Sequence, residues 1–193
     1  MTRIHSIAVF CGSRPGNDPA FAAAARDLGH GLAAAGIRLV YGGGRVGLMG
    51  ILADAVLEAG GTVLGVIPEF LIRWEVAHQG LNEMAVTDSM HDRKRRMFEE
   101  ADAFLSMPGG IGTLDETIEI ISWRQLRLHD KPILICDVAG SSAPLAAALE
   151  ANIARGFAAP ETRRLYEFVE GVPAALDRIK ALPRGPGGPP ERL

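Results

Sequence analysis

Long hydrophobic segments, cysteine and lysine are all scarce in this sequence. No apolar run approaches the ~20 residues that cross a bilayer, and the first residues turn polar too soon for a signal peptide. The two cysteines, Cys11 and Cys136, lack the spacing of a metal site, so we expect two buried, reduced thiols. These features predict a cytoplasmic protein without a disulfide bond, a metal ion or a membrane contact.

Charge and catalytic signatures are also sparse. The net charge of −3 gives no reason to expect nucleic acid as a partner. The chain has no Walker A sequence, no Gly-x-Ser-x-Gly elbow, and no cluster of His, Cys, Asp and Glu with metal-ligand spacing. With 193 residues, of which 48% are hydrophobic, it is long enough for one domain with a buried core. We expect it to use no cofactor.

Short β-rich runs alternate with longer Ala- and Leu-rich runs along the chain. The expected strands cover residues 4–12, 37–43, 62–68, 102–108, 132–138 and 166–171. The expected helices cover residues 18–36, 48–60, 90–101, 113–129, 143–156 and 173–182. This order predicts an α/β fold in which helices cover both faces of a parallel sheet. Residues 1–183 would form this single domain, and the Pro- and Gly-rich residues 184–193 a flexible tail.

Ligands of such folds bind at the carboxyl ends of the strands, and two early loops are expected there. The loop 11–16 offers Ser13 and Arg14 to an anion, although it could equally be an ordinary turn. The loop 41–50 contains a G-x-G-x-x-G pattern between a strand and a helix, which favours phosphate binding over a plain tight turn. No acidic residue ends the next strand, which argues against NAD as the ligand.

A third loop, MPGGIGTLDE at 107–116, combines three glycines with a carboxylate. Its glycines allow amide groups to converge on an anion at the start of the next helix. Glu116 has two interpretations with equal support. It has a chemical role, or it completes a capping box that begins at Thr113.

The helix after this loop is expected to be buried on two sides. One apolar stripe, which should face the sheet, contains Leu114, Ile118 and Ile121. The opposite side carries Glu116, Ile120 and Trp123. A helix that is apolar on both sides predicts a subunit interface near Glu116, and hence a homodimer with its site close to the contact.

The basic run 88–100 predicts a helix whose start carries a capping box, Ser89 to Asp92. Lys94 falls within the apolar stripe of this helix, and Arg93 lies at its edge. Cations near a helix start oppose the helix dipole, a cost that a bound anion or a carboxylate partner would offset. Arg93 and Lys94 are therefore candidate ligand residues.

Together, the segments YGGGRVGLMG, MHDRKRRM and PGGIGTLDE resemble the LOG (Lonely Guy) family of cytokinin-activating phosphoribohydrolases. The resemblance runs from Ile7 to about the last helix. It implies a Rossmann-like homodimer that hydrolyses the N-glycosidic bond of cytokinin riboside 5′-monophosphates, giving free base and ribose 5-phosphate. Many bacterial members look able to use AMP as well, so the resemblance implies AMP as a second substrate.

The resemblance also implies roles for residues at matching positions. Arg93 and Glu116 match the pair held essential for hydrolysis. The implied substrate contacts are Glu75, Lys94, Gly110, Ile111, Gly112, Thr113, Leu114, Asp115 and Ser122, the last in place of a family threonine. The two early loops add Ser13, Gly43, Gly44 and Met49 as candidate contacts. The segment after Glu75, VAHQGLNEM, departs from plant members, so their preference for an N6 substituent is not carried over.

The expected chemistry follows from the positive charge that the sugar develops as an N-glycosidic bond breaks. Glu116 would lie against the ribose and stabilise that charge, and Arg93 would hold the 5′-phosphate or orient Glu116. A non-catalytic nucleotide or cofactor carrier is the alternative, because it would need the glycine loops but not Glu116. A lysine decarboxylase would need a Schiff-base lysine, and of the three lysines only Lys94 is expected near the site.

Overall fold

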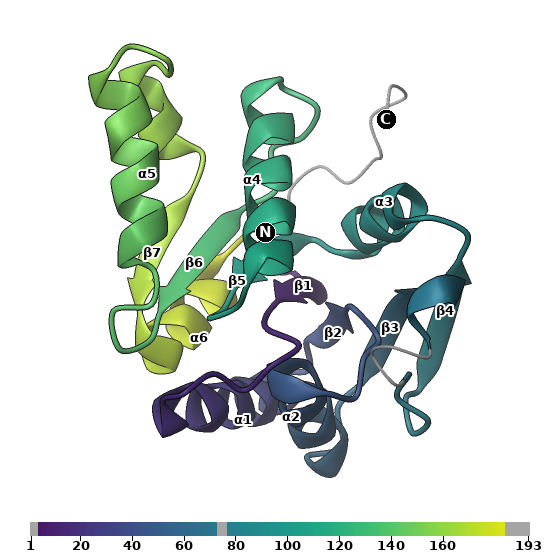
Figure 1. Cartoon of the computed structure of the whole chain (residues 1–193). Helices are drawn as coiled ribbons and strands as arrows, with labels where there is room; N and C mark the ends of the chain where they lie inside the picture. Colours follow the sequence, from purple (N-terminus) through teal and green to yellow (C-terminus); the bar gives the residue numbers. More distant parts are fainter. Residues whose placement is uncertain (1–3, 73–76, 184–193) are drawn as a thin grey trace.

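The computed structural model describes residues 4–72 and 77–183, which form one seven-stranded parallel sheet (Figure 1). The strand order is β4-β3-β2-β1-β5-β6-β7. The strands are β1 (Ser6–Phe10), β2 (Arg38–Tyr41), β3 (Val63–Pro68), β4 (Glu83–Thr87), β5 (Ala103–Ser106), β6 (Ile133–Asp137) and β7 (Glu167–Glu170). The Rossmann-like α/β fold predicted from the sequence is therefore confirmed. The predicted tail, 184–193, lies outside the described residues.

Helices cover both faces of the sheet (Figure 1). One face carries α1 (Pro19–Ala34), α2 (Gly47–Glu58) and α6 (Gly171–Ala181). The other face carries α3 (Met90–Glu100), α4 (Ile111–Gln125) and α5 (Ala143–Ala154). Short 3₁₀ turns, Glu69–Leu71 and Pro160–Arg164, complete the described elements.

The alternation of side chains along the central strand divides the core into two layers. Ile7 and Val9 of β1 pack in the layer with α1, α2 and α6, whereas Ala8 and Phe10 pack in the layer with α3 and α4. All four side chains are almost completely buried. Strands that are apolar on both faces are typical of parallel sheets covered by helices, which explains why β1 reads as a continuous apolar run.

The order of the strands reverses between β1 and β5, and this switch point places the site. The chain runs outward from β1 to β4 and then returns to β5 on the other side of β1. The loop after β1 leads to α1 on one face, and the loop after β5 leads to α4 on the opposite face. A crevice therefore opens between these loops at the carboxyl ends of the two strands, as expected for doubly wound folds.

The predicted elements are present with ends that differ by at most four residues, but the sequence prediction misses β4. This strand lies at the edge of the sheet, pairs only with β3 among the described strands, and is partly exposed along its length. Its sequence, EMAVT, therefore lacks the continuous apolar character of the inner strands. The predicted start of the helix at Ser89 is confirmed, because the Ser89 hydroxyl oxygen accepts a hydrogen bond from the Asp92 amide nitrogen at 3.1 Å.

Three features of the described residues concern membrane-spanning helices, metal-binding clusters and free thiols. No helix in residues 4–72 and 77–183 is long and apolar enough to cross a membrane. The same residues contain no group of three or more His, Cys, Asp and Glu side chains that could hold a metal ion. Cys11 and Cys136 are both free and buried, as predicted.

Lys131 makes the stability of the fold depend on pH in the alkaline range. Its ammonium donates to the Phe98 carbonyl in the last turn of α3 at 2.6 Å and lies 4.0 Å from the centre of the Phe98 ring. Only 7% of Lys131 is exposed, and this burial lowers its pKa from 10.5 to about 8. Between these values the unfolded chain holds more protons than the folded one, so the free energy of unfolding should rise with pH.

We therefore expect the free energy of unfolding to increase by roughly 2 kcal/mol more in the wild type than in Lys131→Met between pH 7 and pH 10. Urea unfolding of both proteins at the two pH values measures this difference. Groups other than Lys131 titrate in both proteins and cancel in the comparison. Parallel pH dependence of the two proteins would contradict a lowered pKa at Lys131.

Candidate active site

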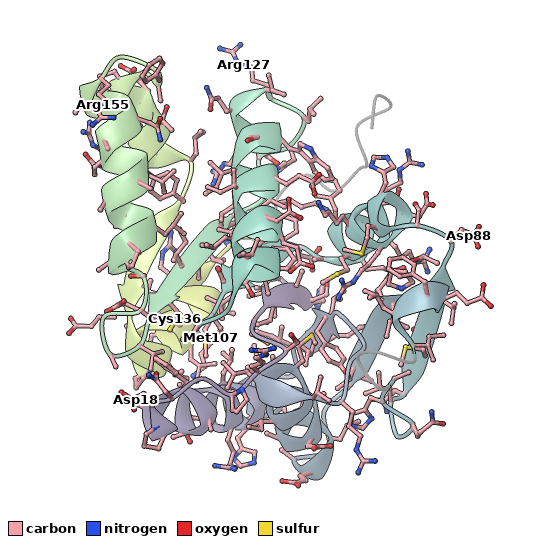
Figure 2. The ribbon with its side chains drawn as sticks, viewed as in Figure 1. Asp18, Asp88, Met107, Arg127, Cys136 and Arg155 are labelled. Carbon is pink, nitrogen blue, oxygen red and sulfur yellow. The ribbon has the colours of Figure 1, made fainter. Side chains whose placement is uncertain are left out.

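A cavity of about 640 Å³ opens at the switch point, between the loops that follow β1 and β5. In Figure 2, Met107 and Cys136 mark the carboxyl ends of β5 and β6, and Asp18 marks the start of α1. The wall combines the loop 11–16, the loop 108–110, the starts of α2 and α4, and one residue of α3. The predicted site residues that line this cavity are Ser13, Arg14, Met49, Arg93, Gly110, Ile111, Gly112, Thr113 and Glu116.

Arg93 is held rigidly at the base of the cavity. Its Nε donates to the Val66 carbonyl of β3 at 3.2 Å, and its Nη2 donates to the Gly42 carbonyl after β2 at 3.2 Å. Only 5% of Arg93 is exposed, and its Nη1 lies 3.9 Å from Oε1 of Glu116. Two backbone carbonyls thus fix the guanidinium so that its remaining edge faces the carboxylate.

Glu116 is not a capping residue, so the capping-box interpretation is wrong. The helix begins at Ile111, two residues before the predicted cap, and Gly110 in extended conformation is its N-cap. Thr113 lies within the first turn, where its carbonyl accepts the Thr117 hydroxyl at 2.6 Å. Glu116 lies beyond that turn, with 12% of its side chain exposed, and lines the cavity.

The orientation of α4 also differs from the helical-wheel prediction. Thr113, Thr117, Ile120 and Ile121 are its buried residues. The predicted sheet-facing stripe is only partly correct, because Leu114 is 44% exposed and Ile118 is 39% exposed. Ile120, predicted on the opposite side, is instead buried in the core. The wheel fails because Thr117 is counted as polar, yet it is fully buried against the Ser106 hydroxyl of β5 at 2.8 Å.

The start of α4 presents its first amides to the cavity. The first helical amide bonded within the chain is that of Leu114, which donates to the Gly110 carbonyl. The amides of Ile111, Gly112 and Thr113 come before it, and in an α-helix such amides point outward from the N-terminus without an intrahelical acceptor. All three residues line the cavity. An anion at this wall would receive these hydrogen bonds and the favourable end of the helix dipole.

The second glycine loop, 41–50, has a different role from the phosphate loop predicted for it. The first amides of α2, from Leu48 and Met49, donate to the Gly12 carbonyl at 2.9 and 3.3 Å. Gly47 has a φ of 61°, and a Cβ there would lie 2.3 Å from the Ser13 backbone. The glycine at this end of the pattern therefore serves to pack the loop 41–50 against the loop 11–16.

Gly42 of the same loop makes room for Arg93. A Cβ at Gly42 would lie 2.1 Å from Nη2 of Arg93. Gly43 packs on β3, and Gly44 pairs with Ala77, so neither lines the cavity.

Other predicted contacts lie away from the cavity wall. Lys94 forms ion pairs with Asp115 and Glu119 of α4, and neither Lys94 nor Asp115 lines the cavity. Leu114 and Ser122 are exposed on α4. Glu75 lies outside the described residues.

The cavity also contains residues that the sequence prediction missed. Ser141 reaches it from the loop after β6, which Asp137 stabilises by accepting the Ser142 amide at 2.8 Å and the Ser142 hydroxyl at 2.6 Å. These bonds lower the pKa of Asp137. An Asp at the end of an apolar strand, followed by Gly-Ser-Ser, is the sequence signal that could have revealed this loop.

Cys11 is another residue of the cavity wall that the sequence prediction missed. Burial raises the pKa of its thiol, and the negative charge of Glu116 raises it further. The thiol is therefore protonated at neutral pH, which excludes a thiolate nucleophile at this position.

The fold and cavity define a doubly wound α/β protein with a pocket at its switch point, lined by the start of a helix. Solved structures share this fold. The molybdenum cofactor binding protein of Rippkaea orientalis has a TM-score of 0.71 and 20% identity, over 94% of this chain and 98% of that one. The molybdenum cofactor carrier protein of Chlamydomonas reinhardtii has a TM-score of 0.68 and 20% identity, over 93% of this chain and 97% of that one. At this identity the likeness concerns the fold alone.

Sequence relatives define the family. A family model described as "Possible lysine decarboxylase" matches residues 49–179. A probable cytokinin riboside 5′-monophosphate phosphoribohydrolase, LOGL1, of Oryza sativa subsp. japonica is 45% identical over 93% of this chain and 79% of its own length. The cytokinin riboside 5′-monophosphate phosphoribohydrolase of Rhodococcoides fascians is 44% identical over 91% and 89%. The chain belongs to this family, the LOG family, which confirms the resemblance seen in its motifs.

The site does not fit the chemistry of a lysine decarboxylase that forms a Schiff base with pyridoxal phosphate. None of the three lysines of the chain lines the cavity. Lys94 is paired with two carboxylates, Lys131 is buried against Phe98, and Lys180 lies 4.0 Å from Asp177 on α6. A Schiff base needs a lysine amine that reaches the bound aldehyde, and these positions do not provide one.

Proposed function

We propose that this protein hydrolyses the N-glycosidic bond of cytokinin riboside 5′-monophosphates, and also of AMP, to free base and ribose 5-phosphate. The observation that carries the proposal is the placement of Glu116 in one cavity with the amide-rich start of α4. The carboxylate can stabilise positive charge and the helix start can bind negative charge, and both lie in the wall of the same cavity. The names of the rice and Rhodococcoides relatives support the cytokinin nucleotide as substrate.

Each wall of the cavity has a role in this reaction. The amides of Ile111, Gly112 and Thr113 bind the 5′-phosphate at the start of α4. The Glu116 carboxylate lies beside the ribose and stabilises the oxocarbenium-like charge that develops as the base departs. Arg93, fixed by the Gly42 and Val66 carbonyls, lies 3.9 Å from Glu116 and orients its carboxylate. Water then adds to the anomeric carbon, and the proton that it loses balances the one that the departing base takes up, giving ribose 5-phosphate and free base.

Substrate range is tested by incubating the purified protein with AMP and with isopentenyladenosine monophosphate, and following free base by chromatography. We expect both bases to be released, and the ratio of the two rates identifies the preferred substrate. Binding of both nucleotides without release of base would contradict hydrolysis and favour a nucleotide carrier on the same fold.

The two unpaired thiols support a cytoplasmic setting for the reaction.

The outward face of α4 supports the proposal that the protein is a homodimer. Ile111, Leu114 and Ile118 are 86%, 44% and 39% exposed and lie on successive turns of the helix that carries Glu116. Apolar side chains grouped on one helix face are typical of an interface. A second copy seated there would lie next to the cavity, since Ile111 also lines it.

We expect Ile118→Arg to convert the dimer to a monomer in sedimentation velocity experiments, because it places a charge in the proposed contact. Phe157→Arg is the matched control, since Phe157 is 80% exposed on the loop after α5. A wild-type protein that sediments as a monomer at micromolar concentration would rule out the homodimer.

A further inference from the structure

Two neighbouring cations of α3 face in different directions. Arg93 is directed into the cavity, where its guanidinium lies 3.9 Å from Glu116. Lys94 instead contacts α4, where its Nζ lies 2.7 Å from Oδ2 of Asp115 and 3.2 Å from Oε2 of Glu119. The two residues therefore contact α4 at adjacent points, one through Glu116 and the other through the carboxylates around it.

The partners of Lys94 flank Glu116 along the helix. Asp115 comes immediately before it, and Glu119 follows one turn later, so three carboxylates lie within little more than one turn of α4. Burial alone would lower the pKa of Lys94, but hydrogen bonds to Asp115 and Glu119 raise it above its ordinary value. Lys94 is thus a firmly held cation that offsets the repulsion between Glu116 and its two neighbours.

The packing around Lys94 leaves no room for substrate. Lys94, Glu116, Glu119 and Trp123 border a void of only about 10 Å³, which is at most the space of a single water. Only 17% of the Lys94 side chain is exposed, and it does not line the large cavity. A nucleotide in that cavity would therefore meet Glu116 and Arg93 but not Lys94, which contacts α4 outside the cavity wall.

Lys94 is one of several contacts that fix the rotation of α4. The inner face of the helix is held by the Thr117 hydroxyl and by Ile120 and Ile121 in the core. Its outer face carries the exposed Leu114 and Ile118. Lys94 contacts the side between these two faces, close to the turn that directs Glu116 toward Arg93.

We propose that Lys94 is a positioning residue, which joins α3 to α4 through Asp115 and Glu119 and so holds Glu116 opposite Arg93 without contacting substrate. This inference rests on the proposed hydrolysis. It replaces the substrate contact that the family resemblance implies for Lys94. To bind substrate, the lysine would have to leave two carboxylates that hold it within hydrogen-bonding distance.

The first test separates kcat from KM in Lys94→Met, a variant that keeps the length of the side chain and removes its charge. We expect kcat for base release to fall about 10- to 100-fold, with KM within about threefold of the wild type, because a misplaced catalytic group affects the chemical step. A rise in KM with unchanged kcat would overturn the proposal and restore Lys94 as a substrate ligand.

The second test is suppression. Adding Asp115→Asn and Glu119→Gln to Lys94→Met removes the two charges that the lysine neutralises, and we expect most of the lost kcat to return. A direct substrate contact would not be restored by these changes, so the absence of any recovery would contradict the positioning role. Lys94→Arg should keep kcat within a few-fold of the wild type, because it preserves the cation. Lys180→Met, on the far helix α6, is the matched control.

Fluorescence of Trp123, which borders the same void as Lys94, gives a readout that does not depend on activity. In a Trp74→Phe background, Lys94→Met should shift the emission of Trp123, and the two carboxylate substitutions should reverse the shift. If the wild type is inactive but the emission shift and its reversal are observed, the proposed hydrolysis is refuted, whereas the contact of Lys94 between α3 and α4 is supported. Unchanged emission, with melting temperatures equal across the variants, would refute the positioning role itself.

Discussion

Glu116→Gln is expected to abolish base release while nucleotide binding falls only a few-fold. Glutamine has the shape of glutamate but no charge, so it cannot stabilise the cation that develops on the ribose. The 5′-phosphate would still bind the amides at the start of α4, which this substitution does not alter. We expect kcat to fall by about 10³-fold or more. Base release and calorimetric titration with AMP measure the two quantities.

The interpretation of this variant depends on a neutral control and on the fold. Glu99→Gln removes a carboxylate from the exposed side of α3 and should leave kcat unchanged. Equal melting temperatures of the two variants would show that Glu116 is not needed for folding. Full activity of Glu116→Gln would mean that the carboxylate has no chemical role in the cavity.

Gly42→Ala should have the second largest effect, although residue 42 is not a catalytic group. A Cβ at this position would lie 2.1 Å from Nη2 of Arg93, so the guanidinium must move away from the Gly42 carbonyl and from Glu116. The backbone at Gly42 is not in the left-handed region, so alanine causes no strain of its own. We expect kcat to fall about 100-fold, because displacement of an active-site group by about 1 Å has effects of this size.

Stability should change much less than activity in Gly42→Ala, because the atom that meets the new methyl group is the tip of a long side chain. Thermal unfolding measures this stability. The matched control is Gly80→Ala, where the new Cβ would meet the His78 ring at an ordinary distance of 3.4 Å. Wild-type kcat in Gly42→Ala would show that the position of the Arg93 guanidinium is not important for the reaction.

The sequence predicts the fold well because the core strands and helices have simple periodic patterns. The inner strand β1 is apolar on both faces, as a covered parallel strand must be. The start of α3 is predictable because Ser89 forms a local cap that depends only on nearby residues. The edge strand β4 is missed because it is partly exposed at the edge of the sheet and its sequence shows no clear alternation.

The site is predicted only in part, because some of its features depend on contacts between distant loops. Arg93 and Glu116 are recognised from their motifs, and the fold brings them together across 23 residues of sequence. The glycine pattern at 41–50 has the composition of a phosphate loop, but its amides are bonded to Gly12, far away in sequence. Local sequence contains no sign of such a partner.

The orientation of α4 fails for a related reason. A helical wheel treats apolar residues as buried, yet the outward face of α4 carries Leu114 and Ile118, and the inward face carries Thr117. An exposed apolar face is indistinguishable in sequence from one that faces the core. The neighbouring Lys94 is similarly ambiguous, since an anion and two carboxylates satisfy a cation equally well.

The most direct test of the proposed hydrolysis is identification of both products from one reaction with isopentenyladenosine monophosphate. Chromatography measures the free base, and phosphorus-31 NMR distinguishes ribose 5-phosphate from inorganic phosphate. Cleavage of the N-glycosidic bond predicts isopentenyladenine and ribose 5-phosphate in equal amounts, with no inorganic phosphate released. Nucleoside with inorganic phosphate, or unchanged nucleotide that remains bound, would contradict the role assigned to Glu116 and the cavity.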